Sequence, residues 1–354
     1  MYPLNAWYAA GWAAELGPQL LARKVCGKAL VMYRTSAGAP VALADACWHR
    51  LVPLSLGRLR GDDVICGYHG IAYDPQGRCT FMPSQETINP SASVDSYPIA
   101  DRHRLSWVWL GDAELADPGL IPNLSIATDP RYAGGGELLH ADCDYRLVLD
   151  NLMDLTHETY LHGSSIGNDA VAEAPFTVEH TDTTVTVRRW MHDITPPPAI
   201  ESELRHRFPG YEGGRIDRWQ IINWLAPSTI VIDAGVAPTG TGADRGDYTR
   251  AVRGYVVNAI APETERTANY YWMRLRDHSL DDEEFGRAQV KQVHDIFEED
   301  RFMLRAQQGA IDNHPEYDFY NLNIDAGGLW VRRLLGRLVE AEDRQSRATA
   351  AGGG

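Results

Sequence analysis

The residues of this 354-residue chain that are best suited to chemistry are two short pairs of cysteine and histidine. Cys47 and His49 form the first pair, and Cys66 and His69 form the second. A zinc site is one possible use, but zinc fingers usually place a C-x-x-C pair before two histidines. Here each pair has one residue of each type, as in a Rieske [2Fe–2S] cluster, where two thiolates hold one iron and two imidazoles hold the other. The spacing therefore predicts a Rieske cluster, with a zinc-stabilised interaction protein as the alternative.

A second site is expected in the segment 145–162, whose apolar residues recur at helical spacing. It carries Asp154, His157 and His162. Two histidines and one carboxylate are typical of a mononuclear Fe(II) with positions left open for dioxygen. The two histidines are five residues apart, so a bulge or a helix end near His162 is needed to aim both at one metal, and Gly163 fits such an end. Without this site the protein would be a Rieske electron-transfer protein.

The composition limits the other functions. A net charge of −15 argues against a nucleic-acid partner, which needs clustered Lys and Arg. No apolar run approaches the ~20 residues of a membrane span, and the first residues do not resemble a signal peptide, so we expect a cytoplasmic protein. Five cysteines are too few for a disulfide framework. Three of them lack a ligand partner nearby and are expected to be packed thiols: Cys26, Cys79 and Cys143.

Two different patterns of elements must position these residues. The first third of the chain has short segments rich in β-branched and aromatic residues, at 28–34, 41–47, 64–73 and 105–112. Later strands at 183–191, 218–237 and 251–262 lie between helical patterns at 145–162 and 281–310. We therefore predict an α+β protein with an all-β domain at 1–115, a linker at 116–136, a larger domain at 137–340 and a flexible tail at 341–354.

The motifs C-W-H…C-G-Y-H-G and N-L-M-D-L-T-H-E-T-Y-L-H resemble those of the Rieske non-haem iron aromatic ring oxygenases. NAWYAAGW, APETE and LNIDAGG extend the resemblance over nearly the whole chain, toward the vanillate O-demethylase type. Trp48 departs from the family, in which this position is usually Pro. The resemblance implies a Rieske domain followed by a helix-grip domain, in which a curved antiparallel sheet wraps a long helix.

The resemblance also assigns roles to individual residues. It implies that His157, His162 and Asp300 bind the iron, that Asn151 lies near it, and that Asp154 links the iron site to a neighbouring subunit's cluster. Glu298 and Glu299, beside Asp300, are interpreted as solvated acidic residues. Three further positions match residues that line the substrate pocket in relatives: Ile232, Asn258 and Lys291.

The implied activity is oxidative O-demethylation of a methoxylated, vanillate-like aromatic acid, with release of formaldehyde. Dioxygen would be the oxidant, and NAD(P)H electrons would arrive through a flavin and [2Fe–2S] reductase. The usual assembly is a homotrimer. The sequence does not separate this activity from methyl hydroxylation of an arene or arylsulfonate by the same kind of enzyme.

Overall fold

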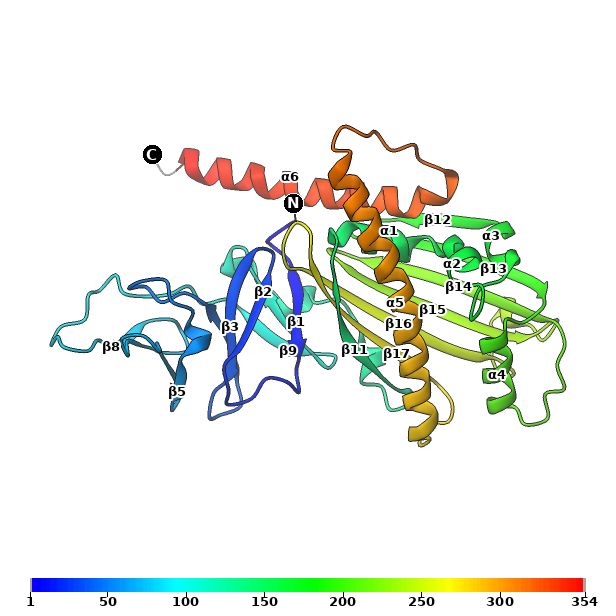
Figure 1. The fold of residues 1–354 in the computed structure, drawn as a ribbon, viewed down its shortest axis with the longest axis horizontal. Helices are drawn as coiled ribbons and strands as arrows, with labels where there is room; N and C mark the ends of the chain where they lie inside the picture. The colour runs from blue at the N-terminus through cyan, green and yellow to red at the C-terminus, as the bar shows by residue number, and fades with distance from the viewer. Residues whose placement is uncertain (1, 353–354) are drawn as a thin grey trace. The chain divides into compact units, whose positions relative to one another are not determined.

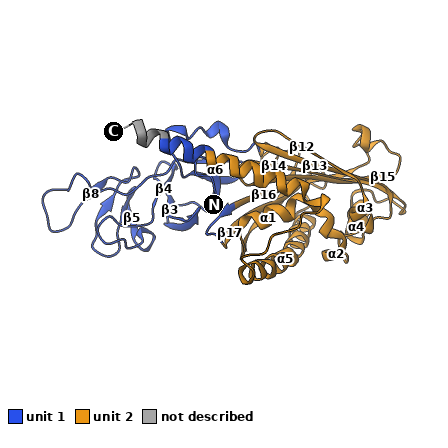
Figure 2. Cartoon of the chain, turned by 90° about the horizontal axis from the view of Figure 1, so that it is seen from above, with its two compact units in different colours: residues 1–123, 261–265, 341–354 blue, residues 124–260, 266–340 orange. Residues whose placement is uncertain are grey.

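The computed structural model describes residues 2–352, which form two compact units (Figure 2). Unit 1 takes in the ranges 1–123, 261–265 and 341–354, and unit 2 takes in 124–260 and 266–340. The two later segments join unit 1 through hydrogen bonds that no local pattern reveals. The Cys26 N–H donates to Pro262 O, and the carboxylate of Glu342 accepts from the N–H groups of Leu4 and Asn5.

Unit 1 is built from short antiparallel strands, as the sequence predicted. Its sheets have the strand orders β1-β10-β9, β2-β3-β4 and β5-β6-β7-β8. Buried side chains such as Val31, Leu43, Leu54 and Tyr73 pack between the last two sheets and the loops that follow them. The strands are β1 (Trp7–Trp12), β2 (Leu21–Val25), β3 (Lys28–Arg34), β4 (Pro40–Ala44), β5 (Arg58–Arg60), β6 (Asp63–Ile65), β7 (Ala72–Tyr73), β8 (Cys79–Phe81), β9 (Ile99–Arg102) and β10 (Leu105–Trp109).

Unit 2 is an antiparallel sheet crossed by one long helix, α5 (Glu283–Asn313), which Figure 1 shows lying over the strands. Within the described chain this sheet has seven strands in the order β11-β17-β16-β15-β14-β13-β12. The arrangement confirms the predicted α+β class and the sheet-and-helix form of the second domain. The strands are β11 (Ala133–Ala141), β12 (Phe176–His180), β13 (Thr184–Ile194), β14 (Ile216–Leu225), β15 (Thr229–Pro238), β16 (Val252–Pro262) and β17 (Ala268–Arg276).

The buried face of α5 mixes apolar and polar side chains. Ile296, Phe297 and Leu304 are buried at helical spacing, as expected for a helix that packs on a sheet. Asp300 and Gln289 are buried on the same helix. Buried polar side chains are uncommon without a partner or a function, so this face of α5 marks a site.

The segment 145–162 is not one helix, contrary to the sequence interpretation. α1 (Tyr145–Met153) ends before Asp154, which is extended at φ −130° and ψ 108°. The Asp154 carboxylate accepts from the Thr156 N–H and so begins a 3₁₀ turn, Leu155–His157, which leads into α2 (Glu158–Leu161). His162 is the residue that ends α2, so the predicted helix end near His162 is present.

The remaining helices are α3 (Asp169–Glu173), α4 (Pro198–Arg207) and α6 (Ala326–Gly352). α6 continues through most of the segment that the sequence assigned to a flexible tail, and residues 353–354 lie outside the described residues. Among residues 2–352, none of the helices combines the length and the apolar character that crossing a membrane requires.

Candidate metal centres

The two Cys/His pairs lie on two loops of unit 1 that share one backbone hydrogen-bond pattern. In each loop the cysteine N–H donates to the carbonyl five residues later, and the cysteine carbonyl accepts from the N–H four residues later. The residue at this last position has a positive φ in both loops, 59° at Leu51 and 77° at Gly70. This left-handed residue closes a tight turn in each loop. The bonds are Cys47 to Val52 and Leu51 to Cys47, and Cys66 to Ile71 and Gly70 to Cys66.

The loops bury the cysteines and expose the histidines. Cys47 and Cys66 are each 2% exposed and are free thiols, whereas the rings of His49 and His69 lie at the surface with centroids 4.8 Å apart. The Tyr73 hydroxyl lies 3.2 Å from the Cys47 sulfur. Two buried thiols and two exposed imidazoles close to each other fit a Rieske cluster, and hydrogen bonds to ligand sulfur tune the potential of such clusters. The sequence analysis missed Tyr73, because its contact with Cys47 spans two loops.

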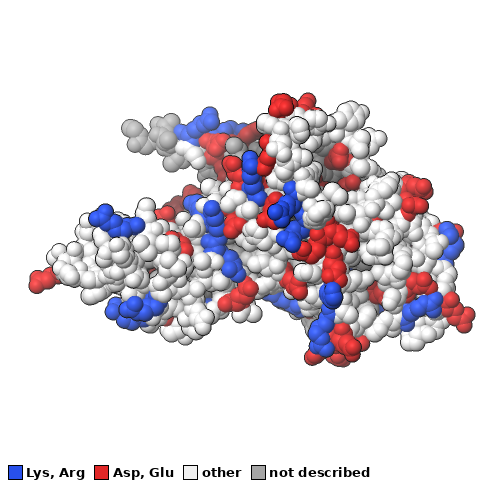
Figure 3. All heavy atoms as spheres, in the orientation of Figure 1, with Lys and Arg blue, Asp and Glu red and all other residues white. Residues whose placement is uncertain are grey.

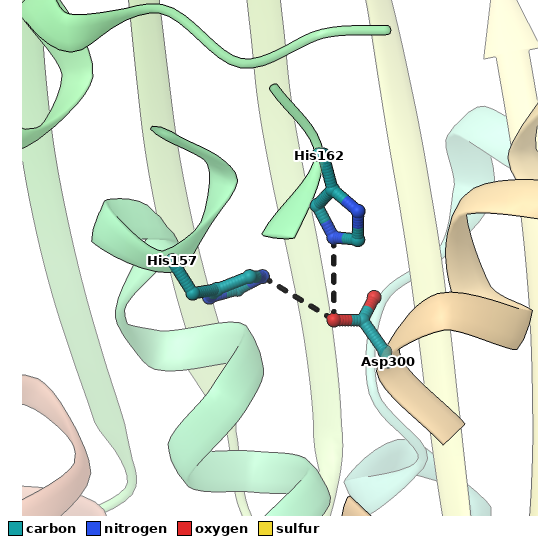
Figure 4. A group of neighbouring side chains, drawn as sticks. All are labelled: His157, His162 and Asp300. Atoms are coloured by element: carbon teal, nitrogen blue, oxygen red, sulfur yellow. Dashed lines mark ion pairs between the residues drawn. The ribbon is translucent and has the colours of Figure 1, made fainter. Parts of the chain in front are cut away.

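The second centre lies in unit 2, where His157, His162 and Asp300 point toward one another (Figure 4). The Asp300 Oδ1 is 3.4 Å from His157 Nε2 and 3.3 Å from His162 Nε2. The three possible ligand atoms lie within 4.8 Å of one another, and His162 and Asp300 are buried. The structure thus brings together the three residues that the sequence and the resemblance selected.

The hydrogen bonds around this triad fit a metal cation. The Nδ1 of His157 contacts the Asp154 carbonyl oxygen at 2.8 Å, and the Nδ1 of His162 contacts a Glu299 carboxylate oxygen at 2.6 Å. Both partners can only accept, so in the neutral rings the proton is on Nδ1 and the lone pair is on Nε2. The buried His162 Nε2 has no hydrogen-bond partner among the described residues. The Nε2 lone pairs of His157 and His162 therefore face the Asp300 carboxylate. A cation such as Fe(II) between them would be a ligand partner for both imidazoles and for the carboxylate.

Three residues around the triad have contacts that the sequence did not specify. Asn151 donates from Nδ2 to Asp300 Oδ1 at 3.1 Å, so it holds the carboxylate. The carboxylate of Asp154 binds Thr156 and lies 3.5 Å from Arg189, and only its backbone carbonyl contacts His157. Glu299 binds His162, so its interpretation as a solvated acid was wrong. Acidic residues next to one another on a helix do not reveal which one faces a ligand.

A cavity of about 160 Å³ opens at the triad inside unit 2. A cavity of about 150 Å³ is enough to hold a benzene molecule, so this one suits a single substituted ring. Its walls are mainly apolar, and they include Leu155, Ile200, Ile232, Val256 and Phe297. Ile232 therefore lines the cavity, as the resemblance implied.

The other two predicted pocket residues do not line the cavity. Asn258 is fully buried, and its amide is bonded to Ile230 O, Val256 O and the Tyr270 hydroxyl. Lys291 is exposed on α5, where it pairs with Asp295 at 2.7 Å. Acidic and basic side chains are mixed along the outer face of this helix (Figure 3). The helix places Lys291 on that charged face, so it does not line the cavity as the resemblance implied.

Two buried polar groups in the cavity wall were missed by sequence reasoning. Near the triad, Glu158 accepts from Arg218 at 2.7 Å and from Gln220 at 2.8 Å. Elsewhere in the wall, Glu203 pairs with Arg274 at 3.3 Å. The only sequence signal was the presence of polar residues at buried positions of strands and helices, since the partners lie far apart in the chain.

The charge of Glu203 is set by its neighbours. Burial alone would raise the pKa of the carboxyl, but Arg274 and His278 beside it lower the pKa to about 2. Glu203 is therefore ionised at neutral pH, and its pair with Arg274 brings a guanidinium group to the cavity wall.

Comparisons with known proteins agree with both centres. Residues 6–98 match the Rieske [2Fe-2S] domain, and residues 141–341 match the vanillate O-demethylase oxygenase C-terminal domain. The chain is 39% identical to the vanillate O-demethylase oxygenase subunit of Pseudomonas sp. strain HR199, over 98% of each chain. It is 36% identical to the toluene-4-sulfonate monooxygenase system iron-sulfur subunit of Comamonas testosteroni, over 97% of this chain and 99% of that one.

Among solved structures, dicamba monooxygenase bound to 3,6-dichlorosalicylic acid is similar, with a TM-score of 0.88 and 30% identity. The match covers 96% of this chain and 98% of that one. The Rieske match decides between the cluster and the zinc alternative, and the oxygenase domain with its metal triad rules out a simple electron carrier. This chain belongs to the vanillate O-demethylase oxygenase family and is a Rieske-type oxygenase component of the O-demethylase type.

Proposed function

We propose that this oxygenase demethylates a methoxylated aromatic acid similar to vanillate. The observation that carries the proposal is the ring-sized cavity, which has a metal triad in its wall and the Arg274 guanidinium in the same wall. An aromatic acid has a planar apolar ring that fits the walls and a carboxylate that Arg can bind through two parallel hydrogen bonds.

Arg274, rather than Lys291, brings a cation to the cavity wall. Its side chain is 14% exposed, and it borders the cavity. The guanidinium passes directly over Gly254, where a Cβ atom would lie 1.6 Å from Nη1. A side chain at position 254 would displace Arg274, so the glycine supports the placement of this cation in the wall.

The overall reaction balances as one methoxyarene, one O₂, two electrons and two protons giving a phenol, formaldehyde and water. A mononuclear Fe(II) held by two histidines and a carboxylate supplies the activation of dioxygen when it is bound. The chain's own residues orient the site: Asn151 holds the Asp300 carboxylate, and Glu299 and the Asp154 carbonyl fix the two imidazoles. The apolar walls exclude water and direct the methoxy group toward the triad.

Electrons require a reductase and, in this proposal, a second copy of the chain. The toluene-sulfonate relative is named as one subunit of a system, which supports a separate reductase that uses NAD(P)H. Exposed apolar side chains surround the cluster histidines, and a second set lies after Asp300 in the chain, on α5 and in the segment that follows it. Large exposed apolar patches often mark protein–protein contacts, which supports a homotrimer that pairs these two surfaces. They are Trp48, Leu51, Leu56 and Tyr68 near the cluster, and Phe302, Met303, Tyr317 and Tyr320 in unit 2.

Asp154 is the proposed link between the two subunits. Thr156 holds its carboxylate in place with contacts of 2.6 and 2.9 Å, and the side chain is 18% exposed. Asp154→Asn keeps the shape and removes the charge, so we expect both metal sites to remain and the transfer of electrons to slow at least tenfold. Single-turnover oxidation of the pre-reduced cluster, with substrate and oxygen present, measures this. A wild-type rate in the variant would remove the link.

The proposed function is tested with a surrogate reductase, NADH and a set of methoxy- and methylarenes. Formaldehyde released in equal amount to the phenol, with oxygen uptake, is the expected result for 4-hydroxy-3-methoxybenzoate. The similarity to the toluene-sulfonate subunit favours methyl hydroxylation as the second candidate. Turnover of 4-toluenesulfonate to the benzylic alcohol, with no formaldehyde from any methoxyarene, would select that candidate instead.

A further inference from the structure

Two glutamine side chains in the cavity wall have the same unusual arrangement. Gln220 on β14 and Gln289 on α5 are 2% and 6% exposed, and both line the cavity. Gln220 donates from Nε2 to Glu158, and the Gln289 amide faces Glu203, whose pKa it helps to lower. The Oε1 atom of each is buried and has no hydrogen-bond partner among the described residues.

The orientation of each amide is fixed by its neighbour. An ionised carboxylate can only accept hydrogen bonds, so the NH₂ end of each glutamine must face its glutamate. Turning either amide around would place a carbonyl oxygen against a carboxylate oxygen. The unpartnered Oε1 is therefore a fixed acceptor, and an unsatisfied buried acceptor costs about 1–3 kcal/mol unless a ligand or water donates to it.

The two acceptors differ in their place in the cavity. Gln220 binds Glu158, the residue that directly follows His157 of the metal triad. Gln289 lies eleven positions before Asp300 on α5, about 16 Å along a helix of ordinary rise. It faces the glutamate that pairs with Arg274. Gln220 is thus the acceptor at the metal end, and Gln289 is at the guanidinium end.

We infer that Gln220 accepts a hydrogen bond from a phenolic hydroxyl on the ring carbon next to the methoxy group. This inference rests on the proposed function, which puts the methoxy group at the triad and the carboxylate at Arg274. Ortho substituents lie side by side, so a hydroxyl next to the methoxy group is also at the metal end. Gln220 would make this oxygenase selective for 2-methoxyphenols among methoxyarenes.

The test compares binding of 4-hydroxy-3-methoxybenzoate with binding of 3-methoxybenzoate, which lacks only the hydroxyl. Calorimetric Kd values and kcat/KM are measured for the wild-type oxygenase. Gln220→Met removes the acceptor with little change in volume, and Gln289→Met is the matched control at the other end. The visible spectrum of the cluster and the thermal midpoint show that each variant is folded.

We expect the wild-type protein to bind the hydroxylated ring about tenfold more tightly, as for one net hydrogen bond. The ratio of the two Kd values should fall to about one in Gln220→Met. Gln289→Met should change both affinities alike and keep the ratio. A ratio that is unchanged in Gln220→Met would overturn the inference.

A third ligand tests the inference without any variant. In 3,4-dimethoxybenzoate the hydroxyl is replaced by a group that only accepts, so its oxygen would face the Gln220 carbonyl. We expect the wild-type protein to bind it more weakly than 3-methoxybenzoate. Equal binding of all three rings would overturn the role of Gln220 and leave the proposed function standing, whereas no binding or turnover of any of them would overturn the proposed function itself.

Discussion

The two metal centres of this oxygenase differ in how the chain builds them. The cluster ligands lie between residues 47 and 69, on two loops of one unit, with the imidazoles exposed. The triad combines His157 and His162, which flank the two ends of α2, with Asp300 on α5, and two of its three members are buried. A centre that exchanges electrons with other proteins benefits from an exposed edge, whereas oxygen activation requires a site that excludes water. Exposure and enclosure therefore follow from the two tasks.

The largest effect should come from breaking the exposed centre. His69→Ala removes one of two ligands of the outer iron, so we expect the Rieske absorption and EPR signal to be lost and turnover to fall below detection. Because His69 lies at the surface, the fold should remain, as circular dichroism would show. Tyr68→Ala, a change of the exposed neighbour, is the control and should retain the cluster. An unchanged EPR signal in His69→Ala would contradict the ligand assignment.

Breaking the enclosed centre should abolish turnover but leave the cluster. Asp300→Ala removes the only carboxylate of the described triad, so iron content should fall from about three to about two atoms per chain while the EPR signal stays. Asp295→Ala on the exposed side of the same helix is the matched control and should keep all the iron. Near wild-type turnover in Asp300→Ala would mean that another carboxylate is the ligand.

The same contrast explains what could be predicted from the sequence. Cys47, His49, Cys66 and His69 are close in the chain, so their spacing alone revealed the cluster. Asp300 is far from the histidines, and only the family resemblance selected it. Local patterns could not show the break at Asp154, because no helix-breaking residue ends α1 and the Asp154 side chain instead caps the 3₁₀ turn that follows.

The cavity was harder still to predict from the sequence. Its polar residues come from separate elements: Glu203 from α4, Gln220 from β14, Arg274 from β17 and Gln289 from α5. Each appears in the sequence as one polar residue in a strand or helix, and their grouping depends on the register of the sheet and the rotation of α5.

A smaller effect should follow from removing the support of a ligand in the enclosed centre. Glu299→Ala leaves His162 Nδ1 without its acceptor, and loss of such a partner typically costs 10- to 100-fold in metal affinity or activity. Glu298→Ala, which breaks only a surface pair with Arg301, is the matched control and should be nearly neutral. Iron affinity and kcat/KM are the measurements. Equal behaviour of the two variants would show that Glu299 does not orient His162.

The smallest effect concerns stability, at the guanidinium end of the cavity rather than at a metal. The pKa of Glu203 falls from its usual 4.5 to about 2 on folding. A depressed pKa contributes stability that is fully present above about pH 4.5 and is lost as the pH falls toward 2, on the order of 3 kcal/mol in all.

Glu203→Gln should therefore lower the thermal midpoint at pH 7, where Arg274 and His278 lose their anion. Its midpoint should fall less steeply than that of the wild type between pH 5 and pH 3. Glu201→Gln on the same helix, whose carboxylate forms a more exposed pair with Arg205, is the control. Parallel curves for Glu203→Gln and the wild type would mean that the buried pair does not contribute to the acid sensitivity of the fold.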